Sequence, residues 1–161
     1  MNEDLGLIKE KVYAPLRMEV TNYQAETESQ DYEACRYQLN GKKIISRSAK
    51  ETPKKPGQFV TFWKRPAPGP IEPFHEADDF DYYIITVRSG DRLGQFVFPK
   101  SVLIAKGLVS TPRREGKRGF RVYPVWDTAT NPQAIGTQRW QLNYFFEMGE
   151  DLSRVRELFK A

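Results

Sequence analysis

The sequence predicts a single domain of the α/β (α+β) class, with a central mixed β-sheet flanked by helices. The 161 residues are about one domain in length and are enough to bury a core. The apolar periodicity changes from helical to alternating and back to helical, which is typical of one sheet covered by helices. No apolar run approaches the roughly 20 residues of a membrane span, and no basic leader precedes the domain. We therefore expect a cytoplasmic protein whose residues 1–161 form one unit.

Helices are predicted toward both ends of the chain. Leu5, Ile8 and Val12 give an apolar stripe for a first helix. A second helix is predicted over residues 27–39, with Tyr32, Cys35 and Leu39 on one face and Asn40-Gly41 as its stop. The later helices are predicted over residues 102–106, 132–147 and the amphipathic tail 152–159.

Strands are predicted in the middle of the chain. They cover residues 43–49, 58–64, 82–87, 93–98 and 120–123. A turn rich in Pro and Lys at 52–57 and a Ser-Gly-Asp turn at 89–91 separate them. Residues 66–79 contain four prolines, so we expect a loop that crosses an edge of the sheet.

Charge is segregated along the chain. Residues 42–65 hold eight Lys or Arg against one acid, residues 66–81 hold five acids and no Lys or Arg, and residues 100–123 hold seven basic residues against one acid. A carboxylate cluster between two basic segments is what a metal-assisted phosphodiester site requires, since carboxylates hold the ion while cations neutralise the polyanion. The alternative is an acidic loop between two solvated faces.

One cysteine and one histidine exclude several kinds of site. Cys35 cannot form an intramolecular disulfide, and zinc sites built from several cysteines are excluded. With His75 as the sole imidazole, histidine-based metal sites and a Ser-His-Asp triad are not serious options. A carboxylate-oxygen site for Mg²⁺ or Mn²⁺ survives, and we expect no organic cofactor.

The restriction-endonuclease core follows the predicted order of elements, and its chemistry uses acids and a lysine on two neighbouring strands. Asp81 stands directly before an apolar run and takes the first position, while Gln95 takes the second and would ligate through its amide oxygen. Their side chains are expected on one side of the sheet, within reach of a shared ion. Glu28 either completes this metal site or only favours the start of a helix. Lys64 or Lys100 would orient the attacking water.

Seven basic residues are candidates for contacting phosphates on one concave surface. They come from the predicted hairpin and from the basic loop with its strand: Arg47, Lys50, Lys55, Arg65, Lys117, Arg118 and Arg121. Trp140, on a predicted helix, is either a core residue or a base-stacking one. The partner would be DNA or RNA.

Blocks in fixed order along residues 26–146 carry a family resemblance. They include Glu28-Ser29-x-x-Tyr32, Gly57-Gln58-Phe59-Val60-x-Phe62-Trp63-Lys64-Arg65, Asp79-Phe80-Asp81, Gly94-Gln95-Phe96-Val97-Phe98, Gly116-Lys117-Arg118-Gly119, Arg121-Val122-Tyr123-Pro124 and Thr137-Gln138-x-Trp140-Gln141. In these blocks the chain resembles the MepB-like family. The resemblance implies a restriction-endonuclease-like fold in a small bacterial protein, without an established activity.

The sequence therefore predicts a nucleic-acid-binding protein, with divalent-metal-dependent phosphodiester hydrolysis as an extension. The alternative is a non-catalytic protein that binds a ligand or a partner and regulates, on a degenerate nuclease fold. Charge segregation favours the first interpretation. Gln95 favours the second, because it stands where the second strand acid is expected.

Overall fold

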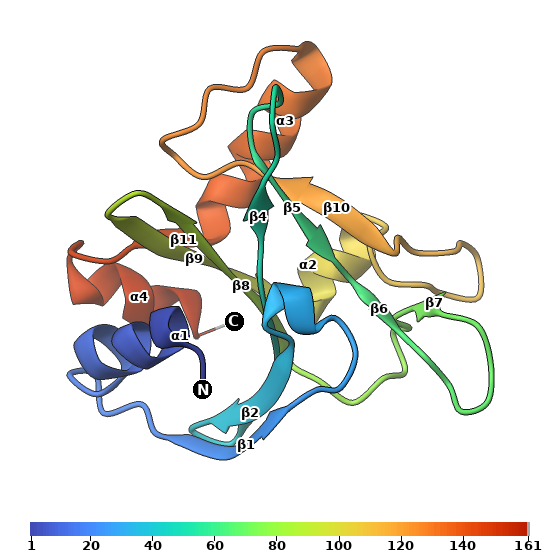
Figure 1. Cartoon of the computed structure of the whole chain (residues 1–161), viewed down its shortest axis with the longest axis horizontal. Helices are drawn as coiled ribbons and strands as arrows, with labels where there is room; N and C mark the ends of the chain where they lie inside the picture. Colours follow the sequence, from blue (N-terminus) through green and yellow to red (C-terminus); the bar gives the residue numbers. More distant parts are fainter. Residues whose placement is uncertain (161) are drawn as a thin grey trace.

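The computed structural model describes residues 1–160 and is built around a six-stranded sheet (Figure 1). The strand order is β1-β2-β3-β8-β9-β11. Its strands are β1 (Val20–Ala25), β2 (Cys35–Leu39), β3 (Lys42–Ser48), β8 (Tyr82–Ser89), β9 (Arg92–Pro99) and β11 (Phe145–Glu147). Strands β3 and β8 pair in parallel and the other neighbours are antiparallel. The predicted central mixed sheet is confirmed.

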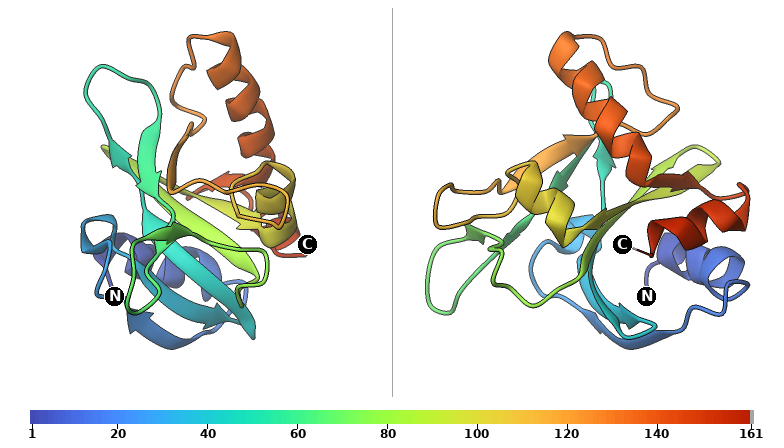
Figure 2. Two further views of the ribbon diagram at one scale, coloured as in Figure 1. Left: turned by 90° about the vertical axis from the view of Figure 1, so that its right-hand side faces the viewer. Right: turned by 180° about the vertical axis from the view of Figure 1, so that it is seen from behind.

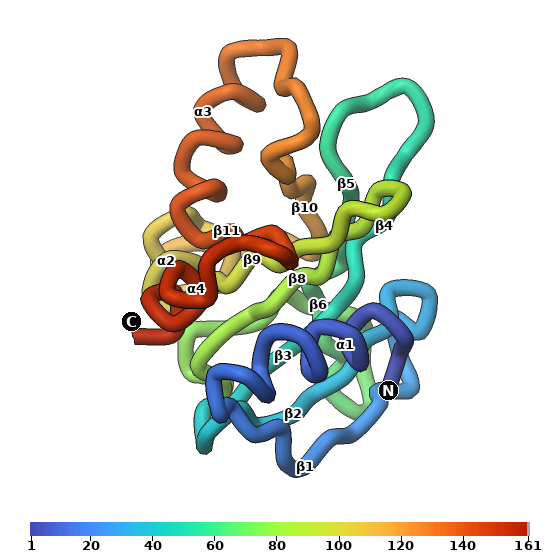
Figure 3. Tube along the Cα trace, turned by 90° about the vertical axis from the view of Figure 1, so that its left-hand side faces the viewer, coloured from blue at the N-terminus to red at the C-terminus, as the bar shows by residue number. Residues whose placement is uncertain are grey.

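Helices from the two ends of the chain cover one face of this sheet, as Figure 3 shows for α1 and α4. These elements are α1 (Glu3–Ile8), the π-helical turn η1 (Lys9–Tyr13) and α4 (Leu152–Leu158). Leu5, Ile8 and Val155 are buried against Tyr82 and Val97 of the sheet. The apolar stripes predicted at both ends of the chain therefore form one layer of the core.

Two small sheets and a helix cover the other face. One sheet has the order β10-β5-β4 and the other pairs β6 with β7. The elements are β4 (Lys50–Glu51), β5 (Gln58–Thr61), β6 (Trp63–Lys64), β7 (Glu72–Pro73), α2 (Lys100–Ala105) and β10 (Gly119–Val122). The core on this side is aromatic, since the ring of Phe62 stacks on Tyr83 at 4.3 Å and contacts Phe74 at 4.8 Å. Strand β8 thus has a core on both faces, which explains its continuous apolar run.

Helix α3 (Pro132–Gln141) stands away from the central sheet, and the segment that leads into it lies between it and the β4–β5 loop (Figure 2). Asn131 caps it by accepting a hydrogen bond from the Ala134 backbone at 2.8 Å, and Pro132 occupies the first turn. A short 3₁₀ turn, η3 (Leu142–Tyr144), follows and leads into β11.

Two of the predicted helices differ from the structure. The helix predicted over 27–39 is wrong: a single 3₁₀ turn, η2 (Gln30–Tyr32), precedes strand β2. In that strand Cys35, Tyr37 and Leu39 are buried in alternation between β1 and β3. The helix predicted over 132–147 ends early, because Phe145 and Phe146 pair with β9 as an edge strand.

Candidate nucleic-acid interface

The predicted metal site on β8 and β9 does not form. Gln95 pairs with Thr86, while Asp81 precedes the first residue of β8, so the two are about 17 Å apart along the strand at ~3.4 Å per residue. They also belong to opposite faces: Gln95 lies on the face that α1 covers, and Asp81 is in register with the face of Tyr83. The prediction that they share an ion is wrong.

Gln95 belongs to a buried polar network. Its Oε1 accepts a hydrogen bond from the Tyr13 hydroxyl at 2.6 Å, and its Nε2 donates to Thr86 Oγ1 at 3.0 Å. The Tyr37 hydroxyl lies 3.4 Å from that of Tyr13. Burial raises the pKa of Tyr13 far above its ordinary value, so its hydroxyl remains a donor. This network satisfies an amide with no exposed surface, which explains a glutamine in a core strand.

Asp81 and Glu28 have structural partners in different places. The Asp81 carboxylate accepts a hydrogen bond from the Lys43 backbone at 2.8 Å and so joins the beginnings of β3 and β8. Glu28 lies in a loop and binds Arg65 through two hydrogen bonds, of 2.7 and 3.3 Å. Within residues 1–160 no group of three or more acidic, His or Cys side chains is placed to hold a metal. Binding of Mg²⁺ or Mn²⁺ stays a prediction, but Asp81, Glu28 and Gln95 do not form one site for the ion.

Lysines of the basic segment before it pair with three carboxylates of the acidic segment, Glu72, Asp78 and Asp79, and the first lysine after it binds the segment's backbone. Lys64 Nζ lies 2.6 Å from Asp78, and Lys43 pairs with Asp79 and lowers the pKa of that carboxyl through a hydrogen bond. Lys100 donates to the backbone carbonyls of Glu76, at 2.9 Å, and Asp78. Lys64 and Lys100, predicted to orient a nucleophile, are therefore engaged in holding this loop.

A different surface keeps its positive charge. A groove of about 510 Å³ lies between α2, β10 and α3, and its lining contains no carboxylate. We call it the basic groove; its charged and aromatic lining residues are Lys106, Lys117, Arg121, Phe120, Tyr123 and Trp140. Lys106 Nζ lies 5.1 Å from the centre of the Trp140 ring, which itself packs on Phe98 at 5.4 Å. Trp140 therefore makes a core contact and also lines the groove, while its stacking on a base stays a prediction.

Arg121 joins the basic groove to the β4–β5 loop. Its guanidinium donates to Thr52 Oγ1 at 2.6 Å and to the carbonyls of Pro56 and Gly57. The nearby acid is Asp127, whose pKa is raised by burial and whose carboxyl is bonded to the Gly57 backbone. Arg121 thus positions the loop, lines the groove and interacts electrostatically with Asp127.

The amides of α3 fix the third wall of the basic groove. Gln141, which is 1% exposed, accepts from the Tyr123 backbone at 2.9 Å and donates to the Arg121 carbonyl at 3.0 Å. Gln138 donates to three carbonyls of the segment after β10. Sequence reasoning missed these residues and Lys106; the signal for the first two was a pair of amides flanking Trp140 on a polar helix.

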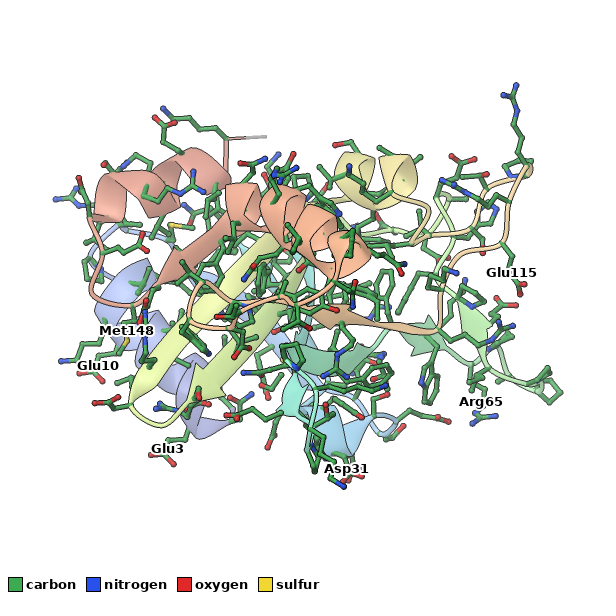
Figure 4. All side chains as sticks on the ribbon, turned by 90° about the horizontal axis from the view of Figure 1, so that it is seen from above. Glu3, Glu10, Asp31, Arg65, Glu115 and Met148 are labelled. Atoms are coloured by element: carbon green, nitrogen blue, oxygen red, sulfur yellow. The ribbon has the colours of Figure 1, made fainter. Side chains whose placement is uncertain are left out.

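The predicted phosphate contacts separate into three groups. Lys117 and Arg121 line the basic groove, while Lys50 is exposed on β4 and Lys55 is exposed in the β4–β5 loop. Two others are paired and exposed, Arg118 with Glu115 at 3.0 Å and Arg65 with Glu28. Figure 4 shows Glu115 and Arg65 toward one end of the molecule and Met148 at the opposite end.

Arg47 contradicts its prediction outright. Its side chain is 1% exposed, so it cannot belong to a surface ridge. The cause is the layer over its face of β3, where its guanidinium donates to Thr61 and Trp63 and lies 5.8 Å from the centre of the Phe74 ring.

Comparisons with known proteins indicate the family. A family model described as MepB-like matches residues 26–147. A crystal structure of MepB is similar with a TM-score of 0.80 and 34% sequence identity, over 94% of this chain and 100% of MepB. A bacterial homing endonuclease is similar with a TM-score of 0.47 and 15% identity over 86% of each chain. A likeness at this level assigns no function to the chain. No curated protein matches the sequence. None of the helices in residues 1–160 has the length and apolar character needed to cross a membrane.

Proposed function

Since this chain belongs to the MepB-like family, a membership that carries no activity with it, we propose a function from its own residues: it binds nucleic acid along the basic groove and the adjoining β4–β5 loop. The observation that carries the proposal is the contrast between two sets of cations. Those beside the acidic segment are neutralised within the chain, while those at the groove face no lining carboxylate. Cations left free in a concave surface favour a polyanionic partner.

The groove also provides contacts that suit nucleotides. Phe120, Tyr123 and Trp140 contribute aromatic surface, on which bases stack regardless of sequence. Asn131 and Gln133 add amides that can hydrogen-bond to base edges or sugars. The proposal covers binding without cleavage, because the residues first assigned to a metal lie apart.

The test is binding of fluorescently labelled DNA, single-stranded and duplex, followed by anisotropy over a series of salt concentrations. Lys106→Gln/Lys117→Gln removes two groove cations that form no ion pair within residues 1–160. We expect it to weaken binding and to reduce the slope of log K against log salt by about 1.5, since each contact contributes roughly 0.7–0.9.

The matched control is Lys9→Gln/Lys11→Gln, which removes the same charge from exposed positions of η1, on the other side of the central sheet. It should leave the slope nearly unchanged. An affinity that does not respond to salt, or an equal effect of the two double variants, contradicts the proposal.

A further inference from the structure

Arg47 is a buried cation without a counter-charge. Its Nη1 donates to Thr61 Oγ1 at 2.9 Å and its Nη2 donates to the Trp63 carbonyl at 2.8 Å, while its Nε has no partner. Arg47 takes part in none of the ion pairs found within residues 1–160. The rings of Trp63 and Phe74, each 5.8 Å from the guanidinium, compensate part of its charge. A guanidinium removed from water with neutral partners only is still unfavourable, so its position favours an anion nearby.

A chain of hydrogen bonds connects this cation to the surface. A guanidinium can only donate, so Thr61 Oγ1 accepts from Arg47 and directs its own proton outward. That proton is donated to Ser29 Oγ at 3.2 Å. The Ser29 hydroxyl then has its proton free, and the orientation of every bond in the chain is set by the buried charge.

The chain ends in a pocket of about 440 Å³. Thr61, Ser29, Trp63 and Tyr32 contribute to its lining. Lys50 Nζ lies 4.9 Å from the centre of the Tyr32 ring, which adds a second positive charge beside the pocket. This pocket shares no lining residue with the basic groove, so its occupancy does not depend on the function proposed above.

We propose that this pocket binds a phosphate monoester that carries a planar ring, the chemistry of a nucleoside monophosphate. The phosphate accepts from Ser29 Oγ and supplies the negative charge that Arg47 lacks, and the ring packs on Trp63 or Tyr32. A volume of this size is typical of small-ligand sites. One lining residue opposes the anion, Asp31, which is exposed and lies at the periphery of the molecule in Figure 4.

The experiment is calorimetric titration at constant ionic strength with adenosine 5′-monophosphate, adenosine and inorganic phosphate. We expect the monophosphate to bind more tightly than either of the other two, since each supplies only one part of the recognition. Ser29→Ala should weaken monophosphate binding about tenfold by removing one charge-assisted hydrogen bond. Asp31→Asn should strengthen it, because a like charge is removed.

Variants of Thr61 distinguish loss of the hydrogen-bond chain from a general loss of stability. Thr61→Ser keeps the hydroxyl and should bind as the wild type does, whereas Thr61→Val interrupts the chain and should behave like Ser29→Ala. Ser101→Ala, at an exposed position on α2, controls for loss of a serine hydroxyl elsewhere. Absence of monophosphate binding by the wild type overturns the proposal, as does wild-type affinity in Ser29→Ala. Equal affinity for inorganic phosphate and the monophosphate overturns the assignment of a ring-bearing ligand.

Discussion

Replacing Gln95 with leucine should destabilise the protein although it adds apolar surface to the core. The amide has no exposed surface and bonds to Tyr13 and Thr86 at 2.6 and 3.0 Å. Gln95→Leu leaves the Tyr13 hydroxyl without its short-range acceptor and Thr86 without a donor. Each polar group left without a hydrogen-bond partner costs about 1–3 kcal/mol of unfolding free energy, and burial of the added apolar surface offsets part of that loss. We expect a net loss of about 2–4 kcal/mol, which for a domain of this size lowers Tm by roughly 5–12 °C.

A double-mutant cycle with Tyr13→Phe identifies the cause. The phenylalanine variant alone strands the Gln95 amide oxygen, but in the double variant both partners of the 2.6 Å bond are gone. The combined loss should therefore be smaller than the sum of the single losses by about 1–2 kcal/mol. Urea unfolding followed by circular dichroism measures all four proteins. If the losses add to within ~0.5 kcal/mol, or if Gln95→Leu is as stable as the wild type, the structural role assigned to this network is refuted.

Two further predictions concern elements at the ends of the sheets. Gln141→Leu removes both hydrogen bonds that join α3 to the Tyr123 and Arg121 backbone. We expect the free energy of unfolding to fall by about 2 kcal/mol and amide exchange at Tyr123 to become faster, and unchanged exchange would contradict this prediction. The hydrogen bond from Arg92 lowers the pKa of Glu147 below its ordinary value, so its contribution is present above about pH 5 and is lost as the pH falls through the lowered pKa. Arg92→Gln should flatten the dependence of stability on pH over that acidic range, and an unchanged profile would contradict this reading.

The strands of the central sheet were predictable where a short run of aromatic and β-branched residues ends at a turn signal. The run from Tyr82 to Val87 is buried on both faces, and a turn at Gly90 separates it from β9. The segment that ends at Leu39 was ambiguous, because Tyr32, Cys35 and Leu39 fit one helix face while Cys35, Tyr37 and Leu39 alternate as in a strand. The segment forms a strand because it pairs with β1 and β3. Such pairing is a tertiary interaction that cannot be read from the local sequence.

The candidate site was predictable in its charges but not in their partners. The sign of each segment was read correctly, yet which segments would neutralise one another depended on contacts such as Lys43 with Asp79 and Lys64 with Asp78, which are far apart in sequence. The burial of Arg47 could not be predicted for the same reason. Its neighbours in sequence suggested a basic surface, while Thr61, Trp63 and Phe74, which come from later segments, cover it in the fold.

The parallel pairing of β3 with β8 has a consequence for the timing of folding. The chain between them, residues 49–81, leaves the sheet and returns, and it contains β4 to β7 together with Thr61 and Trp63. Closing such a long loop has an entropic cost that local contacts do not offset, so we expect this pairing to form late. The pocket above Arg47 would then bind its ligand only after β3 and β8 have paired. Bound ligand would therefore slow the separation of β3 from β8 more than it slows the fraying of the outer strands.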